Sequence, residues 1–104
     1  MKNKKNFYIT TPIYYPNAKP HIGSLYTTLL ADVFSRINFI MGKNSFFLTG
    51  TDEHGQKVFD ASQKERKEIN LFLDEIVGSF QENWQKWNID YSIFYRTTYK
   101  MYVE

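Results

Sequence analysis

The sequence has no cysteine and only three prolines, and it contains no long apolar run. The lack of cysteine excludes disulfides, thiol catalysis and cysteine-ligated zinc or iron–sulfur sites within these residues, and it is typical of a reducing compartment. The most apolar stretch, residues 25–41, is interrupted by Asp32, Arg36 and Asn38. It therefore falls short of the roughly 20 apolar residues of a membrane-spanning helix, and we expect a soluble protein without a membrane partner.

Residues 1–6 form a short basic leader. Pro12 follows soon after it, which leaves no room for the roughly 7–15 apolar residues of a signal-peptide core. The leader also lacks the Arg- and Ser-rich length of a transit peptide. We therefore expect a cytoplasmic protein, with a mitochondrial or other organellar location as the alternative.

The length of 104 residues, with a mass of 12.4 kDa, is enough for one domain with one modest core. Hydrophobic residues make up 42% and aromatic residues 18% of the chain, which is not the composition of a disordered protein. The formal net charge of +2 is too small to indicate a nucleic-acid partner by electrostatics alone. An activity that needs two domains must therefore take its second domain from elsewhere.

The first half of the chain is predicted to form a strand, a helix and a second strand. Aromatic and β-branched residues at Phe7–Thr11 indicate a short strand buried on both faces, and Phe46–Thr49 indicates a second strand that ends at Gly50. The prolines stand four apart within residues 12–20, so this segment is expected to run extended. A helix over Gly23–Met41 then implies a parallel βαβ unit.

The helix predicted for Gly23–Met41 is amphipathic. Asp32, Ser35 and Arg36 occupy its polar side. The helix is therefore expected to bury its apolar side, which consists of Leu25, Leu29, Leu30, Val33, Phe34, Ile37 and Met41.

The second half of the chain is expected to add helices and one more strand. A short helix is predicted at Gln56–Gln63 and a third strand at Tyr91–Arg96. Between them, apolar residues recur every four positions and predict a long amphipathic helix, at Phe72, Ile76, Phe80 and Trp84. The elements together predict an α/β fold with a parallel sheet and flanking helices.

Polar residues follow the first two predicted strands, where open parallel sheets bind ligands. His21 and Ser24 lie in the first turn of the long helix, where free amide groups and the helix dipole favour an anion such as phosphate. Gly23 between them lets a flat ring or a phosphate approach the backbone. Asp52 stands at the end of the second strand, together with Glu53 and His54.

The residues alone also allow plainer interpretations. His21 is explained equally well as a helix cap, and residues 52–54 as a polar turn with local hydrogen bonds. Other chemistries lack their motifs, because neither a nucleophile elbow nor a phosphate-binding P-loop is present. The two histidines follow no metal-ligand spacing, so no metal site is expected within the chain.

Several longer motifs carry a resemblance to a known family. They are YITTPIYYPN at Tyr8–Asn17, PHIGSLYTTLLAD at Pro20–Asp32, FLTGTDEHGQK at Phe47–Lys57 and RTT at Arg96–Thr98. In this order and spacing the chain resembles the methionyl-tRNA synthetase family of class I aminoacyl-tRNA synthetases. Nucleotidylyltransferases share the phosphate-binding histidine motif, but they do not explain the TGTDEHG segment.

The resemblance implies a partial Rossmann-type (HUP-like) parallel sheet with flanking helices. Residues 7–104 would be the N-terminal half of the catalytic domain, which activates methionine with ATP to methionyl-adenylate and transfers methionine to tRNA(Met). ATP is then a substrate, and Mg²⁺ is expected to accompany it. Catalysis would rest on positioning and charge neutralisation rather than on a covalent intermediate.

The resemblance also implies a role for the residues that bind ATP. His21 would contact the phosphates as charge develops, and Gly23 would lie against the adenine. Ser24 stands where the family usually has a second histidine, so it donates a hydrogen bond but carries no charge. Phosphate stabilisation is therefore expected to be weaker here, and Ser24→His is expected to raise adenylation in a completed enzyme.

Three further residues match the methionine-binding positions of the family. Ile13 and Tyr15 would line the pocket for the thioether, which is held by apolar and aromatic contact. Asp52 would accept the α-ammonium group in a charge-assisted hydrogen bond.

The second signature of the family, a KMSKS loop, has no counterpart in the sequence. We therefore expect an incomplete domain that is inactive alone and leaves an edge and the faces of its sheet uncovered. Binding of tRNA is expected only through regions outside this chain. In one interpretation, a companion chain supplies those regions. The alternatives are a split or degenerate binding module derived from a synthetase and a stand-alone nucleotidylyltransferase.

Overall fold

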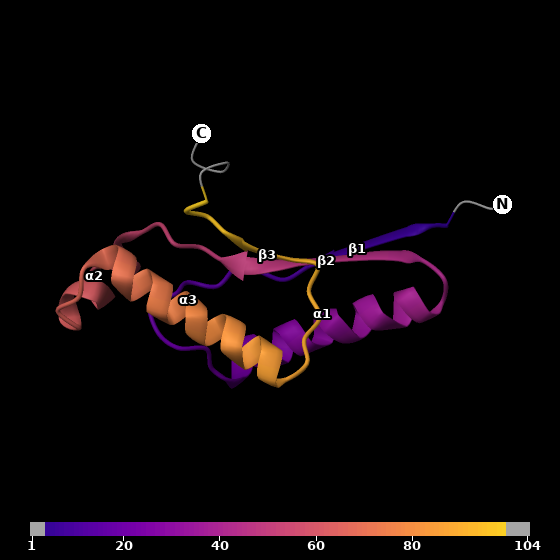
Figure 1. Cartoon of the computed structure of the whole chain (residues 1–104), viewed down its shortest axis with the longest axis horizontal. Helices are drawn as coiled ribbons and strands as arrows, with labels where there is room; N and C mark the ends of the chain where they lie inside the picture. The colour runs from indigo at the N-terminus through magenta and orange to yellow at the C-terminus, as the bar shows by residue number, and fades with distance from the viewer. Residues whose placement is uncertain (1–3, 100–104) are drawn as a thin grey trace.

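The computed structural model describes residues 4–99, which form a three-stranded parallel sheet with helices (Figure 1). The strands lie in the order β1, β2, β3, with Tyr8 opposite Phe46 and Thr49 opposite Phe94. This arrangement confirms the predicted α/β fold, including the third strand. The elements are β1 (Asn6–Thr10), α1 (Ile22–Ile40), β2 (Asn44–Thr51), α2 (Gln56–Lys64), α3 (Ile69–Lys86) and β3 (Ile93–Arg96).

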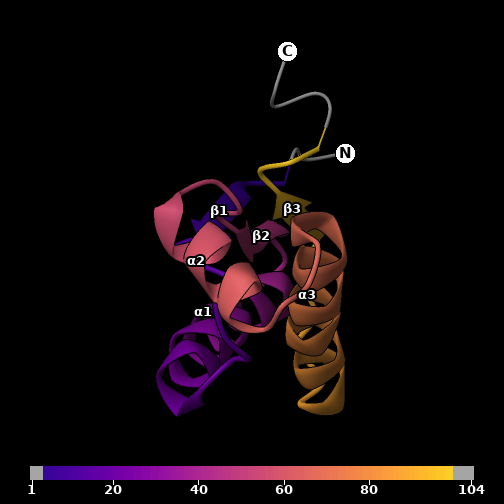
Figure 2. The same cartoon turned by 90° about the vertical axis from the view of Figure 1, so that its left-hand side faces the viewer.

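The long helices α1 and α3 lie on the same side of the sheet in both views (Figures 1 and 2). Their inner sides and the facing side of the sheet form the main core, which includes Phe47, Val77, Phe80, Trp84 and Phe94. The helix α2 packs against the start of α3 through a smaller cluster of Val58, Phe72 and Leu73. Within the described residues 4–99, no helix has the length and hydropathy of a membrane span.

No element within residues 4–99 covers the other side of the sheet, so the expectation that the first strand is buried on both faces is wrong. Tyr8 on this side is 60% exposed, and its ring pairs with that of Phe46 at 5.6 Å. Exposed and half-buried residues alternate along β1, as in a strand that has one covered face. The expected uncovered face is thus present, and β1 begins and ends one residue before the predicted strand.

The helix α1 presents mainly its polar side to the core, which contradicts the predicted orientation for most of its apolar residues. Only Leu25 and Leu29 pack against the main core as predicted. Thr28, Ser35 and Asn38 are buried, whereas Val33 and Ile37 are 49% and 45% exposed. Small side chains let the helix approach the sheet closely, and their hydroxyl groups find partners there. The Ser35 hydroxyl, for example, pairs with that of Ser45 on β2 at 2.8 Å.

Asp32 is buried on this same side of α1, and it satisfies both of its carboxylate oxygens. It accepts hydrogen bonds from Arg36 Nε at 2.8 Å and from the backbone N–H of Asp90 at 2.8 Å. The side chain of Arg36 also donates to the carbonyl of Asn88. These contacts join α1 to the segment between α3 and β3, which explains how a charged residue is buried beneath the sheet.

Gly50 lies inside β2 rather than at its end. A Cβ atom at this position would overlap the carbonyl oxygen of Tyr95 on the neighbouring strand. The glycine therefore allows β3 to approach β2, and pairing continues to Thr51 opposite Arg96. The sequence pattern treats glycine as a strand end and does not reveal this close approach.

The segment of residues 12–20 is not helical, as predicted, but it is not extended throughout. Tyr14 forms an isolated parallel bridge with Thr51, and a turn follows at residues 16–18. The turn directs the chain back toward the start of α1. It thereby places His21 at the edge of the sheet where β1 and β2 end.

Candidate active site

The loops that follow β1 and β2 are joined by backbone hydrogen bonds. The N–H of Tyr14 donates to the carbonyl of Gly50 at 3.1 Å, and the N–H of Asp52 donates to the carbonyl of Tyr14 at 2.8 Å. Tyr14 itself stacks on Phe80 of α3 and pairs its hydroxyl with that of Thr28 at 2.9 Å, so its ring belongs to the core. The two loops therefore meet at the carboxyl edge of the sheet, as predicted.

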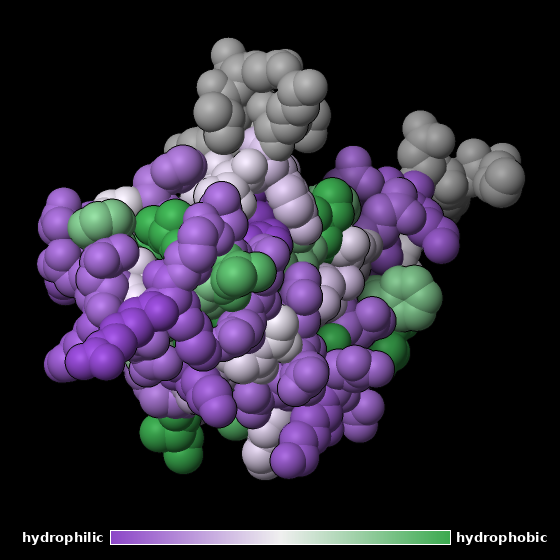
Figure 3. Space-filling view, turned by 60° about the vertical axis from the view of Figure 1, so that its left-hand side comes forward, coloured by the Kyte–Doolittle hydropathy of each residue, from purple (hydrophilic) through white to green (hydrophobic). Residues whose placement is uncertain are grey.

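A cavity of about 290 Å³ opens at this edge. Four of the predicted site residues, Ile13, Tyr15, His21 and Ser24, line it together with Phe80. Gly23 and Asp52 are not among the lining residues, although Asp52 is bonded to Tyr14, which is one of them. Figure 3 shows this end of the molecule, where small apolar groups alternate with hydrophilic side chains.

His21 caps the N-terminus of α1 with its own side chain. Its Nδ1 atom accepts a hydrogen bond from the N–H of Gly23 at 3.0 Å. A ring nitrogen that accepts a hydrogen bond carries no proton, so in the neutral ring the proton lies on Nε2. The cap thus leaves a donor nitrogen at the cavity, beside the positive end of the helix dipole.

Ser24 completes a capping box with His21. Its hydroxyl oxygen accepts from the N–H of His21 at 3.1 Å and donates its proton to the carbonyl of His21 at 2.8 Å. The residue is only 6% exposed. In this arrangement the hydroxyl proton is used inside the cap, so the direct effect of Ser24 is to hold the backbone of His21.

Gly23 leaves room for the capping ring. A Cβ atom there would lie 2.8 Å from Cε1 of His21 and 3.0 Å from its Nδ1. A larger residue would therefore push the imidazole out of its capping position. This is a second reason for glycine, in addition to the adenine contact that the resemblance implies.

The two predicted methionine-pocket residues are open to solvent. Ile13 is 44% and Tyr15 is 54% exposed. Tyr15 stands between the cavity of about 290 Å³ and a neighbouring one of about 220 Å³, whose other lining residues are His54–Val58. An apolar ligand at this position would contact both side chains and cover them.

Asp52 is half-buried at the end of β2. Its backbone N–H is bonded to Tyr14, while its carboxylate has no hydrogen-bond or ion-pair partner within residues 4–99. An unpaired carboxylate near the cavity is suited to a cationic group of a ligand.

The sequence indicates no specific role for Glu53 beyond a part in the polar loop after the second strand. Its side chain is fully buried and receives hydrogen bonds from Thr51, Arg96 and Thr98. Hydrogen bonding to Glu53 raises the pKa of Arg96 above its ordinary value, so the guanidinium stays charged. The sequence shows the Arg-Thr-Thr motif at residues 96–98, but it does not show that this motif pairs with Glu53.

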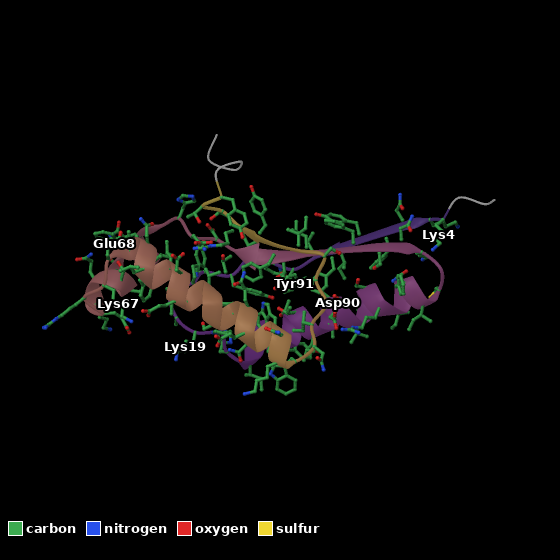
Figure 4. All side chains as sticks on the ribbon, viewed as in Figure 1. Lys4, Lys19, Lys67, Glu68, Asp90 and Tyr91 are labelled. Atoms are coloured by element: carbon green, nitrogen blue, oxygen red, sulfur yellow. The ribbon has the colours of Figure 1, made fainter. Side chains whose placement is uncertain are left out.

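A second cavity of about 420 Å³ lies away from this edge, between α1 and the segment that leads into β3. Arg36, Asp90 and Tyr91 line it, and Figure 4 shows the last two where the chain passes from α3 to β3. Burial raises the pKa of Tyr91 above its ordinary value. None of the predicted site residues borders this cavity.

No group of three or more histidine or carboxylate side chains converges on a metal position within residues 4–99. The described residues therefore do not fit a metal ion held by protein ligands alone. A cation that accompanies a phosphate ligand would need to be held by that ligand.

Comparison with known proteins identifies the family. The family model described as "tRNA synthetases class I (M)" matches residues 7–104. This chain belongs to that family. The match confirms the resemblance drawn from the motifs, and it covers nearly the whole chain.

Two bacterial relatives are similar to this chain in sequence. The chain is 51% identical over 98 residues to the methionine–tRNA ligase of Thermotoga maritima and 49% identical over 102 residues to that of Clostridium tetani. These matches cover 94% and 98% of this chain, but only 16% of each relative. The chain thus spans a small part of the length of the curated relatives that it matches.

Solved structures agree with this assignment. The methionyl-tRNA synthetase of Mycobacterium tuberculosis with bound methionyl-adenylate has a TM-score of 0.90 and 36% identity, over 92% of this chain and 19% of that one. LeuRS of Agrobacterium radiobacter has a TM-score of 0.91 at 21% identity, a likeness that concerns the fold alone. The partial Rossmann-type fold that the resemblance implied is confirmed.

Proposed function

We propose that this chain supplies the ATP- and methionine-binding edge of a methionine–tRNA ligase. The observation that carries the proposal is the cavity of about 290 Å³, which brings Ile13, Tyr15, His21 and Ser24 together. The family resemblance implies a methionine-binding role for two of these residues and an ATP-binding role for the other two. The curated relatives are named for methionine and tRNA, and the neighbouring structure holds methionyl-adenylate.

The ATP side of the proposed site is the first turn of α1. Phosphate oxygens would accept a hydrogen bond from Nε2–H of His21, whose ring is already oriented by its bond to Gly23. The free amide groups of the helix N-terminus add further donors. Ser24 keeps the backbone of His21 in place through the capping box.

The methionine side is formed by Asp52, Ile13 and Tyr15. The unpaired carboxylate of Asp52 would accept the α-ammonium group, and the exposed apolar surfaces of the other two residues would pack against the thioether. The substrate carboxylate then attacks the α-phosphorus of ATP, and pyrophosphate leaves with the electrons of the broken P–O bond. Holding both substrates at one edge makes the attack effectively unimolecular.

The rest of the reaction lies outside the described residues. Mg²⁺ would enter as the counter-ion of ATP, and tRNA(Met) would be bound by other regions of the ligase. A companion chain, and a cytoplasmic or organellar location, stay predictions. Activity therefore has to be measured in a completed enzyme, in which this chain replaces the matching segment of the Thermotoga maritima ligase.

The test is methionine-dependent exchange of pyrophosphate into ATP by the completed enzyme. His21→Ala is expected to lower the rate constant by about 100-fold, because a donor to the developing phosphate charge is lost. The control is Glu68→Ala, which removes the side-chain cap of α3 at Leu71 N–H instead. Both variants lose one cap, worth about 1 kcal/mol of stability, but only the first loses the phosphate donor.

Three outcomes would contradict the proposal or part of it. Exchange that depends on another acid substrate and not on methionine would favour the stand-alone nucleotidylyltransferase. Binding of a second chain without any exchange would favour the degenerate binding module. Equal losses in the two cap variants would remove His21 from the phosphate site.

A further inference from the structure

Glu53, next to the proposed ammonium-binding residue, is held more tightly than any local turn requires. Its side chain is 0% exposed. Arg96 donates to it from two nitrogens, with Nε 2.9 Å from Oε2 and Nη2 2.8 Å from Oε1. The hydroxyls of Thr51 and Thr98 donate to it at 2.8 and 3.1 Å.

The same cluster holds the backbone at this point. The N–H of Glu53 donates to the hydroxyl of Thr97 at 2.7 Å, and the N–H of Thr97 donates to the carbonyl of Thr51 at 3.2 Å. Arg96 also reaches α3, where it pairs with Asp74 at 3.0 Å. The residues on both sides of Asp52 are therefore bonded to the end of β3, and Arg96 links that end to α3.

A buried ion pair of this kind is poor evidence of stabilisation, because desolvation offsets much of the attraction between the charges. A pair of apolar residues of similar volume fills such a space equally well. The two-pronged contact between a guanidinium and a carboxylate adds a fixed geometry instead. The cluster therefore suits a function that needs a fixed position for residues 51–53.

We propose that Arg96 is a positioning residue, which through Glu53 sets the carboxylate of Asp52 to receive the ammonium group of the amino-acid substrate. Consecutive side chains of a nearly extended chain point to opposite sides, so drawing Glu53 inward directs Asp52 outward. The burial of these residues follows this alternation, with Asp52 half-buried between buried Thr51 and buried Glu53. The proposal rests on the proposed function.

The experiment compares methionine with an analogue that lacks the α-amino group, 4-(methylsulfanyl)butanoate, in the completed enzyme. Glu53→Gln and Arg96→Lys are expected to raise the KM for methionine about tenfold, because the ammonium loses its aligned partner. The KM for ATP and the inhibition constant of the analogue are expected to stay within about twofold, because neither depends on the carboxylate of Asp52.

Asp74→Asn is the matched control. It removes the negative charge of the second partner of Arg96, a side chain that is 65% exposed, and it leaves the bonds between Arg96 and Glu53 in place. Its methionine KM is expected to match that of the unchanged enzyme. Arg96→Lys keeps the buried positive charge, so it carries the test if Glu53→Gln fails to fold.

The outcomes separate this proposal from the one on which it rests. If the completed enzyme without any substitution shows no methionine-dependent exchange, the proposed function and the positioning role are both overturned. An active enzyme whose Arg96 and Glu53 variants keep their methionine KM overturns the positioning role alone. Parallel loss of methionine, ATP and analogue binding also overturns it, since that pattern indicates a general loss of structure.

Discussion

At the scale of single residues, His21 and Ser24 show how one short motif serves the fold and the proposed chemistry together. The ring of His21 accepts from Gly23 N–H, and the hydroxyl of Ser24 bonds both the N–H and the carbonyl of His21. The plain interpretation of His21 as a helix cap is therefore correct, and it is compatible with a phosphate-binding role. Capping leaves the other ring nitrogen as the donor.

The replacement of Ser24 by histidine tests this double role. Ser24→His is expected to raise the rate constant of adenylate formation in the completed enzyme about tenfold, because an imidazolium adds a charge near the phosphates. It is also expected to cost about 1 kcal/mol of stability, because the reciprocal cap is lost.

Ser24→Ala is the control for that replacement, since it loses the same cap without adding a charge. The two variants are compared by thermal unfolding and by single-turnover adenylation. The two unfolding temperatures should fall together, while adenylation should rise only in the histidine variant. A histidine variant no faster than the alanine variant would rule out the charge effect.

At the scale of elements, sequence periodicity located every helix and strand described here, but it misjudged how two of them pack. The α1 pattern of large apolar residues predicted an inner face, yet Thr28, Ser35 and Asn38 face the sheet. Local patterns report which side of a helix is apolar. They do not report whether a sheet lies close enough to require small side chains.

The cluster around Glu53 was out of reach of the sequence for a related reason. It forms because Thr51 pairs with Arg96 across neighbouring strands, 45 positions apart in the numbering but adjacent in the sheet. The charges of Glu53 and Arg96 are visible in the sequence, but their pairing depends on the register of β2 and β3. By contrast, His21 and Ser24 were found readily, because their geometry is that of a single helical turn.

The contact between β2 and β3 leads to a prediction about Gly50. Gly50→Ala is expected to destabilise the chain by about 3 kcal/mol or more, because the added Cβ meets the backbone carbonyl of Tyr95, which cannot move without breaking the strand pairing. Gly78→Ala in α3 is the matched control. A Cβ there meets no atom within 4 Å, so that variant is expected to gain up to about 1 kcal/mol.

Urea unfolding followed by far-ultraviolet circular dichroism measures both glycine variants. The two changes add the same methyl group, so a difference in sign isolates the close approach of the strands. Equal effects of the two substitutions would contradict the assigned role of Gly50.

At the scale of the whole molecule, the described chain has two layers, with one layer of helices under a bare sheet (Figure 2). Its shortest dimension is 17 Å, against 57 Å along its longest axis. So thin a shape leaves large side chains uncovered, among them Phe34 and Ile40 of α1 at 50% and 81% exposure. Apolar surface of this extent favours association with itself or with other polypeptide.

The exposed side of α1 provides a test that separates the observed packing from the predicted one. The double variant Val33→Glu with Ile37→Lys places an ion pair four residues apart on residues that are 49% and 45% exposed. It is expected to keep its circular dichroism spectrum, while dye binding to apolar surface and self-association in sedimentation experiments both fall. Ala31→Glu, at a residue only 5% exposed in the main core, is expected to lose the fold and shows that the spectrum responds to a misplaced charge. If the double variant unfolded as Ala31→Glu does, the apolar side of α1 would be its buried side after all.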